Sequence, residues 1–307
     1  MTVHAKWTAK ALVAAFGDYQ RRTRGVSDGT LRYCERYVRM FLRESLGGDP
    51  IDVRKLRPRH VIGFVVSMST RYGASTVPSI SSAVRSYLRY LRATGIFRTH
   101  IERAIPRTPR WRLSTLPKGL TDEQHRELLG SLDDSTPHRR RDRAIVLCIA
   151  GLGLRAGEVA GMCLDDIDWR AGSIHVRRRK TCRGAVLPLP YDIGESIVAY
   201  LRDGRPRTAA RQVFVRHYRP SVGVPLTRSA ICAVVRTAIR RAAIDPPHRG
   251  PHALRHTLAT RMVRRGASFR EIADVLGHQG ISSTEIYAKV DLPSLAAVAL
   301  PWPEVMP

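Results

Sequence analysis

Four side chains that can act on a phosphodiester lie within residues 251–287. His252 and Arg255 are three residues apart, so on a helix they would share one face. His278 follows an apolar helical run, and Tyr287 lies nine residues further on. Arginine donates paired hydrogen bonds to phosphate oxygens, histidine transfers protons near neutral pH, and a tyrosine hydroxyl can act as a nucleophile. Together these residues indicate a site suited to a phosphodiester.

The order and spacing of these residues resemble the C-terminal signature of the tyrosine recombinases, which include phage integrases and Xer-type enzymes. The signature reads H-x-x-R-H, then L-G-H, then a tyrosine. Taken singly, each piece has a structural explanation, such as a core tyrosine, a polar helix end or a structural His–Arg pair. The ordered set favours the recombinase interpretation. The matching residues are His252, Arg255, His256, Leu276, Gly277, His278 and Tyr287.

Two residues further upstream also match this resemblance. Arg155 emerges from a glycine-rich turn and corresponds to the first catalytic arginine of the family, and Glu158 is placed to brace it. Lys180 lies between two short strand patterns, where the family has a lysine on a β-hairpin. Arg179 and Thr181 replace the glycines that usually flank this lysine. An alternative for Lys180 is therefore one more cation on a basic hairpin near DNA.

Breaking a phosphodiester by side-chain attack requires charge neutralisation, a nucleophile and a proton for the leaving group. Two arginines can neutralise the charge that develops on the nonbridging oxygens, with histidines as further donors. Tyr287 is the expected nucleophile and His252 its candidate base. The resemblance implies that Lys180 protonates the departing 5′ oxygen and that the product is a 3′-phosphotyrosyl link, so rejoining needs no ATP. The predicted catalytic residues are Arg155, Lys180, His252, Arg255, His278 and Tyr287, supported by Glu158 and His256.

Neither a metal ion nor another cofactor is expected. Asp165, Asp166 and Asp168 are close in sequence but have no identifiable partner acid for a magnesium site. The five cysteines include no C-x-x-C pair and no zinc-site spacing. Cys34 and Cys148 fall in apolar stretches and are predicted to lie in the core.

The net charge of the chain indicates its partner. There are 52 basic and 26 acidic residues among 307, which gives a charge of +26. A polyanion explains such an excess, and double-stranded DNA is the expected partner. No run reaches the roughly 18 apolar residues of a membrane span, and the first residues lack a secretory signal pattern. We therefore expect no membrane partner and a cytoplasmic, nucleoid-associated protein.

The expected fold is mainly α-helical with a small β-sheet, in two domains. Residues 8–95 follow the pattern of four helices separated by glycines. A bundle over residues 1–104 resembles the SAM-like core-binding domain that binds DNA in this family. Residues 105–119 are basic and contain three prolines, so they are predicted to be a linker. Residues 120–307 resemble the mixed α+β catalytic domain.

Local patterns predict the elements of the second domain. Helices are expected over residues 139–150, 191–201 and 229–243, and strands over residues 173–178 and 185–189. Three capping boxes predict further helix starts, at Thr121 with Gln124, Ser268 with Glu271, and Ser282 with Glu285.

Seven arginines are predicted to contact DNA phosphates. Three lie on one face of the fourth helix of the first domain, one in the linker, and three on the β-hairpin. A solvated surface of the bundle is the alternative for each arginine of the fourth helix. These residues are Arg85, Arg89, Arg92, Arg110, Arg177, Arg178 and Arg179.

The resemblance implies a site-specific recombinase or integrase that cuts and rejoins two DNA duplexes through a Holliday junction. By the same resemblance, four copies would assemble on two DNA sites, and the C-terminal segment would fold back on its own domain or dock on a neighbouring copy. Two alternatives remain open. One is a type IB topoisomerase-like enzyme, which relaxes DNA without strand exchange. The other is a DNA-binding protein that uses the fold without cleavage.

Overall fold

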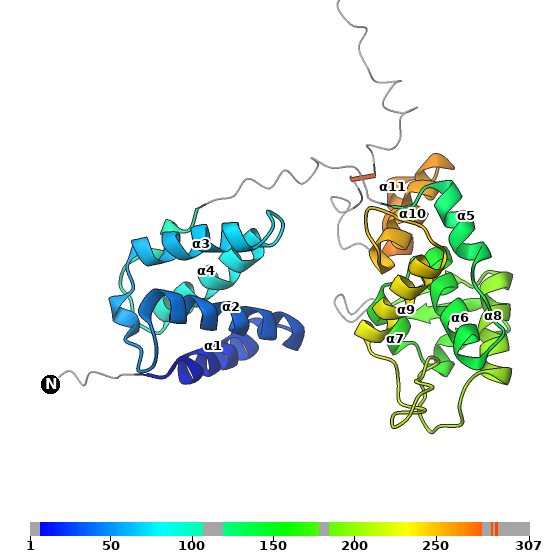
Figure 1. The fold of residues 1–307 in the computed structure, drawn as a ribbon, viewed down its shortest axis with the longest axis horizontal. Helices are drawn as coiled ribbons and strands as arrows, with labels where there is room; N and C mark the ends of the chain where they lie inside the picture. Colours follow the sequence, from blue (N-terminus) through cyan, green and yellow to red (C-terminus); the bar gives the residue numbers. More distant parts are fainter. Residues whose placement is uncertain (1–6, 107–118, 178–183, 278–283, 285, 288–307) are drawn as a thin grey trace, which may run out of the picture. The chain divides into compact units, whose positions relative to one another are not determined.

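The structure is a computed structural model that describes residues 7–106, 119–177, 184–277, 284 and 286–287. The chain divides into two compact units, Met1–Arg110 and Trp111–Pro307, each with its own hydrophobic core (Figure 1). Most described residues are helical, and the described strands form one small sheet. The predicted fold class is therefore confirmed.

Unit 1 contains the four helices that are expected between residues 8 and 95. They are α1 (Ala9–Arg24), α2 (Asp28–Leu46), α3 (Pro58–Arg71) and α4 (Val77–Ala93), with the short 3-10 helices η1 (Val53–Lys55) and η2 (Ile101–Ala104). Helix α1 ends at Gly25, whose φ of 55° lies in the left-handed region that glycine adopts at little cost.

The core of unit 1 follows the apolar stripes of its helices. Phe16 of α1 packs edge-on against Tyr87 of α4, with ring centroids 5.4 Å apart. Cys34 is predicted to lie in the core. It packs against the core of unit 1 but is only partly buried. The predicted stripe of α4 is buried throughout and consists of Ile80, Ala83, Val84, Tyr87, Leu88 and Leu91.

Helix α6 (Pro137–Leu152) is the central helix of unit 2. It contacts α8 (Tyr191–Asp203), α9 (Arg228–Arg241) and α10 (Pro251–Arg264). Every residue from 144 to 150 is buried, including the predicted core residue Cys148. A helix that is apolar on all sides has to be covered on all sides.

The remaining helices of unit 2 are shorter. They are α5 (Asp122–Gly130), α7 (Ala156–Gly161), η3 (Leu164–Asp166) and α11 (Phe269–Leu276). Helices α10 and α11 are neighbours (Figure 1). The three helices predicted from periodicity are present, and their ends lie within two residues of the predicted ones.

The sheet of unit 2 has the antiparallel order β1-β2-β3. The strands are β1 (Ile167–Asp168), β2 (Ser173–Val176) and β3 (Ala185–Pro188). Ile174 pairs with Ile167 on one side and Leu187 on the other, and all three side chains are buried. Strands β2 and β3 confirm the predicted pair. Strand β1 has no sequence signal, because two residues are too few to show an alternating pattern.

Two of the three predicted capping boxes are present. The N–H of Gln124 donates to Oγ1 of Thr121 at 3.2 Å, and the N–H of Thr121 donates back to Oε1 of Gln124 at 3.2 Å. Ser268 and Glu271 form the same reciprocal pair at the start of α11. The third box falls outside the described residues. Within the described part of the chain, no helix is long and apolar enough to cross a membrane.

Candidate active site

Arg255 lies on α10 with only 6% of its surface exposed. Its guanidinium donates to the backbone carbonyls of Gly153 and Leu276. Gly153 is the residue after α6, and Leu276 is the last residue of α11. Arg255 therefore joins the ends of two helices to the helix that carries it.

Arg155 lies at the start of α7 and also contacts the end of α11. Its Nη1 donates to Oε1 of Glu158 at 2.8 Å, and its backbone N–H donates to Oε2 of the same carboxylate at 2.8 Å. Its Nη2 donates to the carbonyl of Gly277 at 2.9 Å. Glu158 thus holds Arg155 at both its main chain and its side chain. The two arginines bind consecutive carbonyls, those of Leu276 and Gly277.

Gly153 makes this arrangement sterically possible. Its φ of 64° lies in the left-handed region. A Cβ atom at this position would come within 2.8 Å of Leu276 Cδ2 and 2.9 Å of Leu258 Cδ2. The turn after α6 therefore needs glycine both for its backbone conformation and for its close approach to α10 and α11.

Tyr287 lies against the inner surface formed by α10 and α11, and only 1% of its surface is exposed. Its hydroxyl lies 2.7 Å from Nδ1 of His256, and the two rings are 5.7 Å apart. Burial raises the pKa of Tyr287 to about 12, although the nearby charge of Arg255 acts in the opposite direction. The phenol is therefore protonated at neutral pH.

His256 is the histidine that contacts the phenol. Burial, then the charges of His252 and Arg255, lower its pKa to about 4. A neutral imidazole donates at one ring nitrogen and accepts at the other, so the phenol donates to Nδ1 in the tautomer that carries its proton on Nε2. His252 is more exposed, and its ring lies 6.5 Å from that of His256. Partial burial and Arg255 also lower the pKa of His252.

The sequence pattern assigns the base role to His252 and only a supporting role to His256, whereas the structure places His256 against the phenol. Both histidines lie on α10 beside Arg255, so neither spacing nor helical periodicity separates them. The position of Tyr287, 31 residues beyond His256, decides which ring it meets. No local sequence signal carries that information.

Several predicted site residues fall outside the described part of the chain. They are Arg110, Arg178, Arg179, Lys180 and His278. Gly277, directly before His278, ends α11 with a φ of 59°. Strands β2 and β3 flank the segment that contains Lys180.

The described DNA-binding candidates have different surroundings. Arg89 is exposed on α4, and Arg85 is partly buried. Arg92 forms an ion pair with Glu102 at 3.3 Å. Arg177 forms one with the buried carboxylate of Asp166 at 2.6 Å. Arg92 and Arg177 therefore each have a structural partner within their own unit.

The acidic residues after α7 have arginine partners. Asp165 pairs with Arg211, and Asp166 pairs with Arg177. Among the described residues, no group of three or more histidine, cysteine, aspartate or glutamate side chains is arranged to hold a metal ion.

The chain resembles known proteins over most of its length. Residues 118–292 match the model of the phage integrase family. The integrase/recombinase y4rA of Sinorhizobium fredii is 40% identical over 291 residues, which cover 95% of this chain and 70% of that protein. The tyrosine recombinase XerA of Thermococcus kodakarensis is 30% identical over 272 residues, which cover 88% of each chain.

Solved structures share the fold at low sequence identity. The Tn1549 transposon integrase in complex with a circular intermediate DNA matches with a TM-score of 0.72 and 18% identity, over 95% of this chain and 100% of that one. The XerH recombinase bound to its palindromic difH substrate matches with a TM-score of 0.72 and 16% identity, over 96% and 97%. The chain belongs to the phage integrase family and is an enzyme of the tyrosine recombinase class.

Proposed function

We propose that this chain is a site-specific DNA recombinase that cleaves and rejoins strands through a 3′-phosphotyrosyl intermediate and a Holliday junction. One observation carries the proposal. Arg155 and Arg255 bind consecutive carbonyls at the end of α11, and the Tyr287 hydroxyl is held on the helix that carries Arg255. Two guanidiniums and a phenol from distant parts of the chain therefore share one site.

The arginines supply the positive charge that the transition state requires. A guanidinium has five N–H donors in a fixed plane. Bonds to Glu158 and Gly277 orient Arg155, whose side chain is 40% exposed, so phosphate oxygens can reach it. Arg255 is more deeply buried, and its charge acts on the same site over a short distance. Donors fixed before the reaction stabilise developing charge without reorganisation.

Tyr287 is the proposed nucleophile, and His256 is the proposed proton acceptor. The phenol oxygen forms a bond to phosphorus, its proton passes to His256 Nδ1, and the bond from phosphorus to the 5′ oxygen breaks. Because Tyr287 is only 1% exposed, DNA binding has to open the site so that the phosphate reaches the hydroxyl while it still contacts His256. His252, at the more exposed end of α10, would then donate to a nonbridging oxygen.

The resemblance to the family supplies the remaining roles of the proposal. Lys180 would protonate the departing 5′ oxygen, and His278 would bind a nonbridging oxygen. The covalent link keeps the energy of the phosphodiester, so attack by a 5′-hydroxyl rejoins the strand without ATP. Neither step as proposed uses a metal ion.

The proposed partner is double-stranded DNA. The charge of +26 supports it, as do the DNA complexes formed by the Tn1549 integrase and XerH, which share this fold. In this proposal residues 1–104 and 120–307 each contact the duplex. Four copies on two sites would bring together the strands to be exchanged, and exchange of the C-terminal segments between copies is part of the same proposal.

Covalent capture tests the chemistry even while the target sequence is unknown. A pool of nicked duplexes of randomised sequence is incubated with the protein, denatured in SDS, and the DNA that stays attached to protein is sequenced. We expect recovery of one related set of sequences with the wild type and none with Tyr287→Phe. Equal recovery with Tyr287→Phe would exclude this nucleophile.

The captured duplex then separates the competing functions. Recombination between two copies of the site distinguishes a recombinase from a topoisomerase-like enzyme, which would only relax supercoiled DNA. Binding without any adduct would favour the non-cleaving alternative. Adduct formation in EDTA is expected to equal that in its absence, and loss of the adduct would contradict the metal-free mechanism.

A further inference from the structure

Helix α10 carries a second row of contacts, on a different face from His252 and His256. The first described residues of unit 2 lie on this face. The N–H of Leu120 donates to Oγ1 of Thr257 at 2.7 Å, and that hydroxyl donates to the carbonyl of Ala253 at 2.9 Å. Thr257 is only 2% exposed. One buried hydroxyl therefore links a turn of α10 to the chain that enters the unit.

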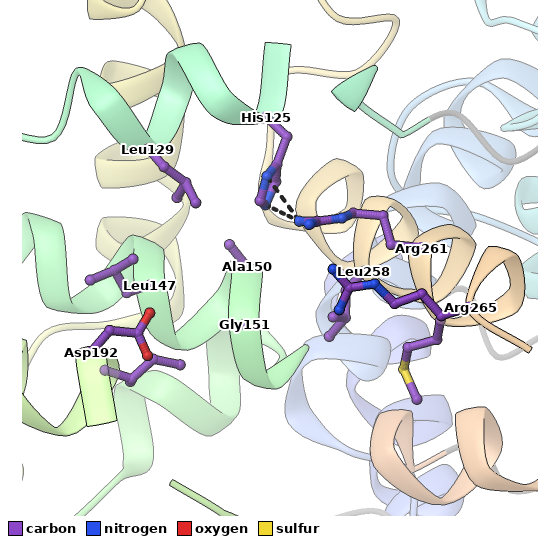
Figure 2. A pocket seen from close by; sticks show the side chains of 11 residues that line it. His125, Leu129, Leu147, Ala150, Gly151, Asp192, Leu258, Arg261 and Arg265 are labelled. Carbon is purple, nitrogen blue, oxygen red and sulfur yellow. Dashed lines mark hydrogen bonds between the residues drawn. The ribbon is translucent and has the colours of Figure 1, made fainter. Parts of the chain in front are cut away.

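Two further contacts continue along the same face of the helix. Arg261 donates to Nδ1 of His125 at 3.0 Å across the pocket shown in Figure 2. Arg264 pairs with Asp122 at 3.0 Å. Positions 257, 261 and 264 are four and three residues apart, so they lie in one row along the helix. Residues 120–125 are thus held to α10 at three successive points.

The contact at Thr257 is also sterically tight. A Cβ atom on Gly119 would lie 2.9 Å from Oγ1 of Thr257 and 3.0 Å from its backbone nitrogen. The main chain at residue 119 therefore rests directly on the helix backbone. A shift of this segment must move α10 as well, because backbone atoms cannot yield as a flexible side chain can.

Thr257 is adjacent to the residues proposed to carry the chemistry. It follows His256 directly and lies two residues after Arg255, and both depend on the rotation of α10 for their contacts. His256 has to meet the phenol of Tyr287 at 2.7 Å, and Arg255 has to reach carbonyls on two other helices. A small rotation of this turn would misplace all of these groups together.

We propose that Thr257 is a positioning residue for strand cleavage. Its hydroxyl, held between the Leu120 N–H and the Ala253 carbonyl, fixes the turn of α10 that presents Arg255 and His256. This inference rests on the proposed function, because the groups that it positions are those of the cleavage reaction. Thr257 itself touches neither DNA nor Tyr287 in this role.

Two substitutions separate the hydroxyl from the shape of the side chain. Thr257→Val keeps the branched shape but leaves the Leu120 N–H buried without its acceptor. Thr257→Ser keeps the hydroxyl and removes the methyl group. Ser131→Ala is the matched control, since the Ser131 hydroxyl also donates to a carbonyl of its own helix, that of Leu128 at 2.8 Å, away from α10.

The measurement is the single-turnover rate of adduct formation on the captured duplex at saturating DNA, together with DNA affinity and Tm. We expect Thr257→Val to slow cleavage roughly tenfold or more with unchanged affinity. Thr257→Ser and Ser131→Ala should keep the wild-type rate. All assays run well below the lowest Tm of the set.

A wild-type rate in Thr257→Val would overturn the inference. So would equal slowing in Thr257→Val and Thr257→Ser, or slowing that Ser131→Ala shows as well, because loss of packing would explain either result. Absence of any adduct with the wild-type protein would instead refute the proposed function, so the two failures are distinguishable.

Gly119→Ala tests the same contact by changing the segment that packs on Thr257. The added methyl group has to push the main chain away from Thr257, so cleavage should slow while affinity is retained. Gly130→Ala is its control, because a Cβ atom at Gly130 meets no described atom within 4 Å. Equal rates for the two alanine variants would contradict the proposed role of this contact.

Discussion

The hydroxyl of Tyr287 lies 2.7 Å from Nδ1 of His256. Burial raises the pKa of Tyr287 to about 12 and lowers the pKa of His256 to about 4. At neutral pH this is a neutral phenol beside a neutral imidazole. Both groups are thus in the protonation state in which the phenol can donate and the imidazole can accept. The proposed nucleophile is therefore protonated and covered in this structure.

His256 should make the protein less stable in mild acid. Its pKa of about 4 in the folded state lies below the ordinary value of 6.5, so the unfolded chain binds the proton first. The contribution of His256 to stability is therefore complete above pH 6.5 and declines as the pH falls toward 4. The decline amounts to about 3 kcal/mol at most.

Denaturant unfolding of the wild type and His256→Gln between pH 7.5 and 4.5 measures this effect. The free energy of unfolding of the wild type should fall more steeply with acid than that of the variant, because glutamine does not titrate. Parallel curves for the two proteins would show that His256 does not have the lowered pKa. The histidines that do not interact with His256 are common to both proteins and cancel in the difference.

Glu158→Gln should slow cleavage while leaving DNA affinity nearly unchanged. Glu158 binds both the backbone N–H and the guanidinium of Arg155, so its charge orients the arginine. Loss of a charged hydrogen bond of this kind costs about 1.5–3 kcal/mol, and we expect a rate reduction of roughly tenfold or more.

Glu123→Gln is the control for this substitution, because Glu123 pairs with Arg126 at the same i,i+3 spacing on an exposed surface. Adduct formation on the captured duplex is the readout for both variants. If both react at the wild-type rate, Glu158 does not orient Arg155 for cleavage.

Gly153→Ala should destabilise unit 2 and reduce cleavage. A left-handed backbone costs an alanine about 1–2 kcal/mol, and its methyl group would press on Leu258 and Leu276. The carbonyl of Gly153 that binds Arg255 would shift as a result. Thermal unfolding and the cleavage rate measure the two effects. Gly130→Ala should lower neither the stability nor the rate, because Gly130 lies in a helix with open space around it. A Gly153→Ala protein as stable and active as the wild type would rule out this role of the turn.

The arginine face of α4 should contribute to the salt dependence of DNA binding. Each phosphate contact adds about 0.9 to the slope of log affinity against log salt concentration. Replacing Arg85, Arg89 and Arg92 together with glutamine should therefore flatten this slope by up to about 2.7. Replacing Arg92 alone should change the slope by less than about 0.9, because its charge is partly neutralised by Glu102.

Arg21→Gln is the matched control in unit 1, since Arg21 pairs with Asp18 on the exposed surface of α1. Affinity is measured on the captured duplex over a range of salt concentrations. An unchanged slope in the triple variant would assign that face of α4 to solvent.

Much of the local structure could be predicted because its contacts are close in sequence. The capping boxes at Thr121 and Ser268 and the buried stripe of α4 depend on residues within one or two helical turns. The same holds for the Arg155–Glu158 pair, three residues apart. Local spacing determines such contacts because the geometry of a helix start is nearly constant.

Only the tertiary structure decided which distant residues meet at the site. Arg155 reaches Gly277 across 122 residues, and Arg255 reaches Gly153 across 102. Which histidine meets Tyr287 depends on how Tyr287 packs against α10. The sequence by itself determined which groups were available for the chemistry and which helices carry them. Packing of separate elements brought these groups together, since hydrogen bonds between distant residues follow from the fold and have no fixed spacing along the chain.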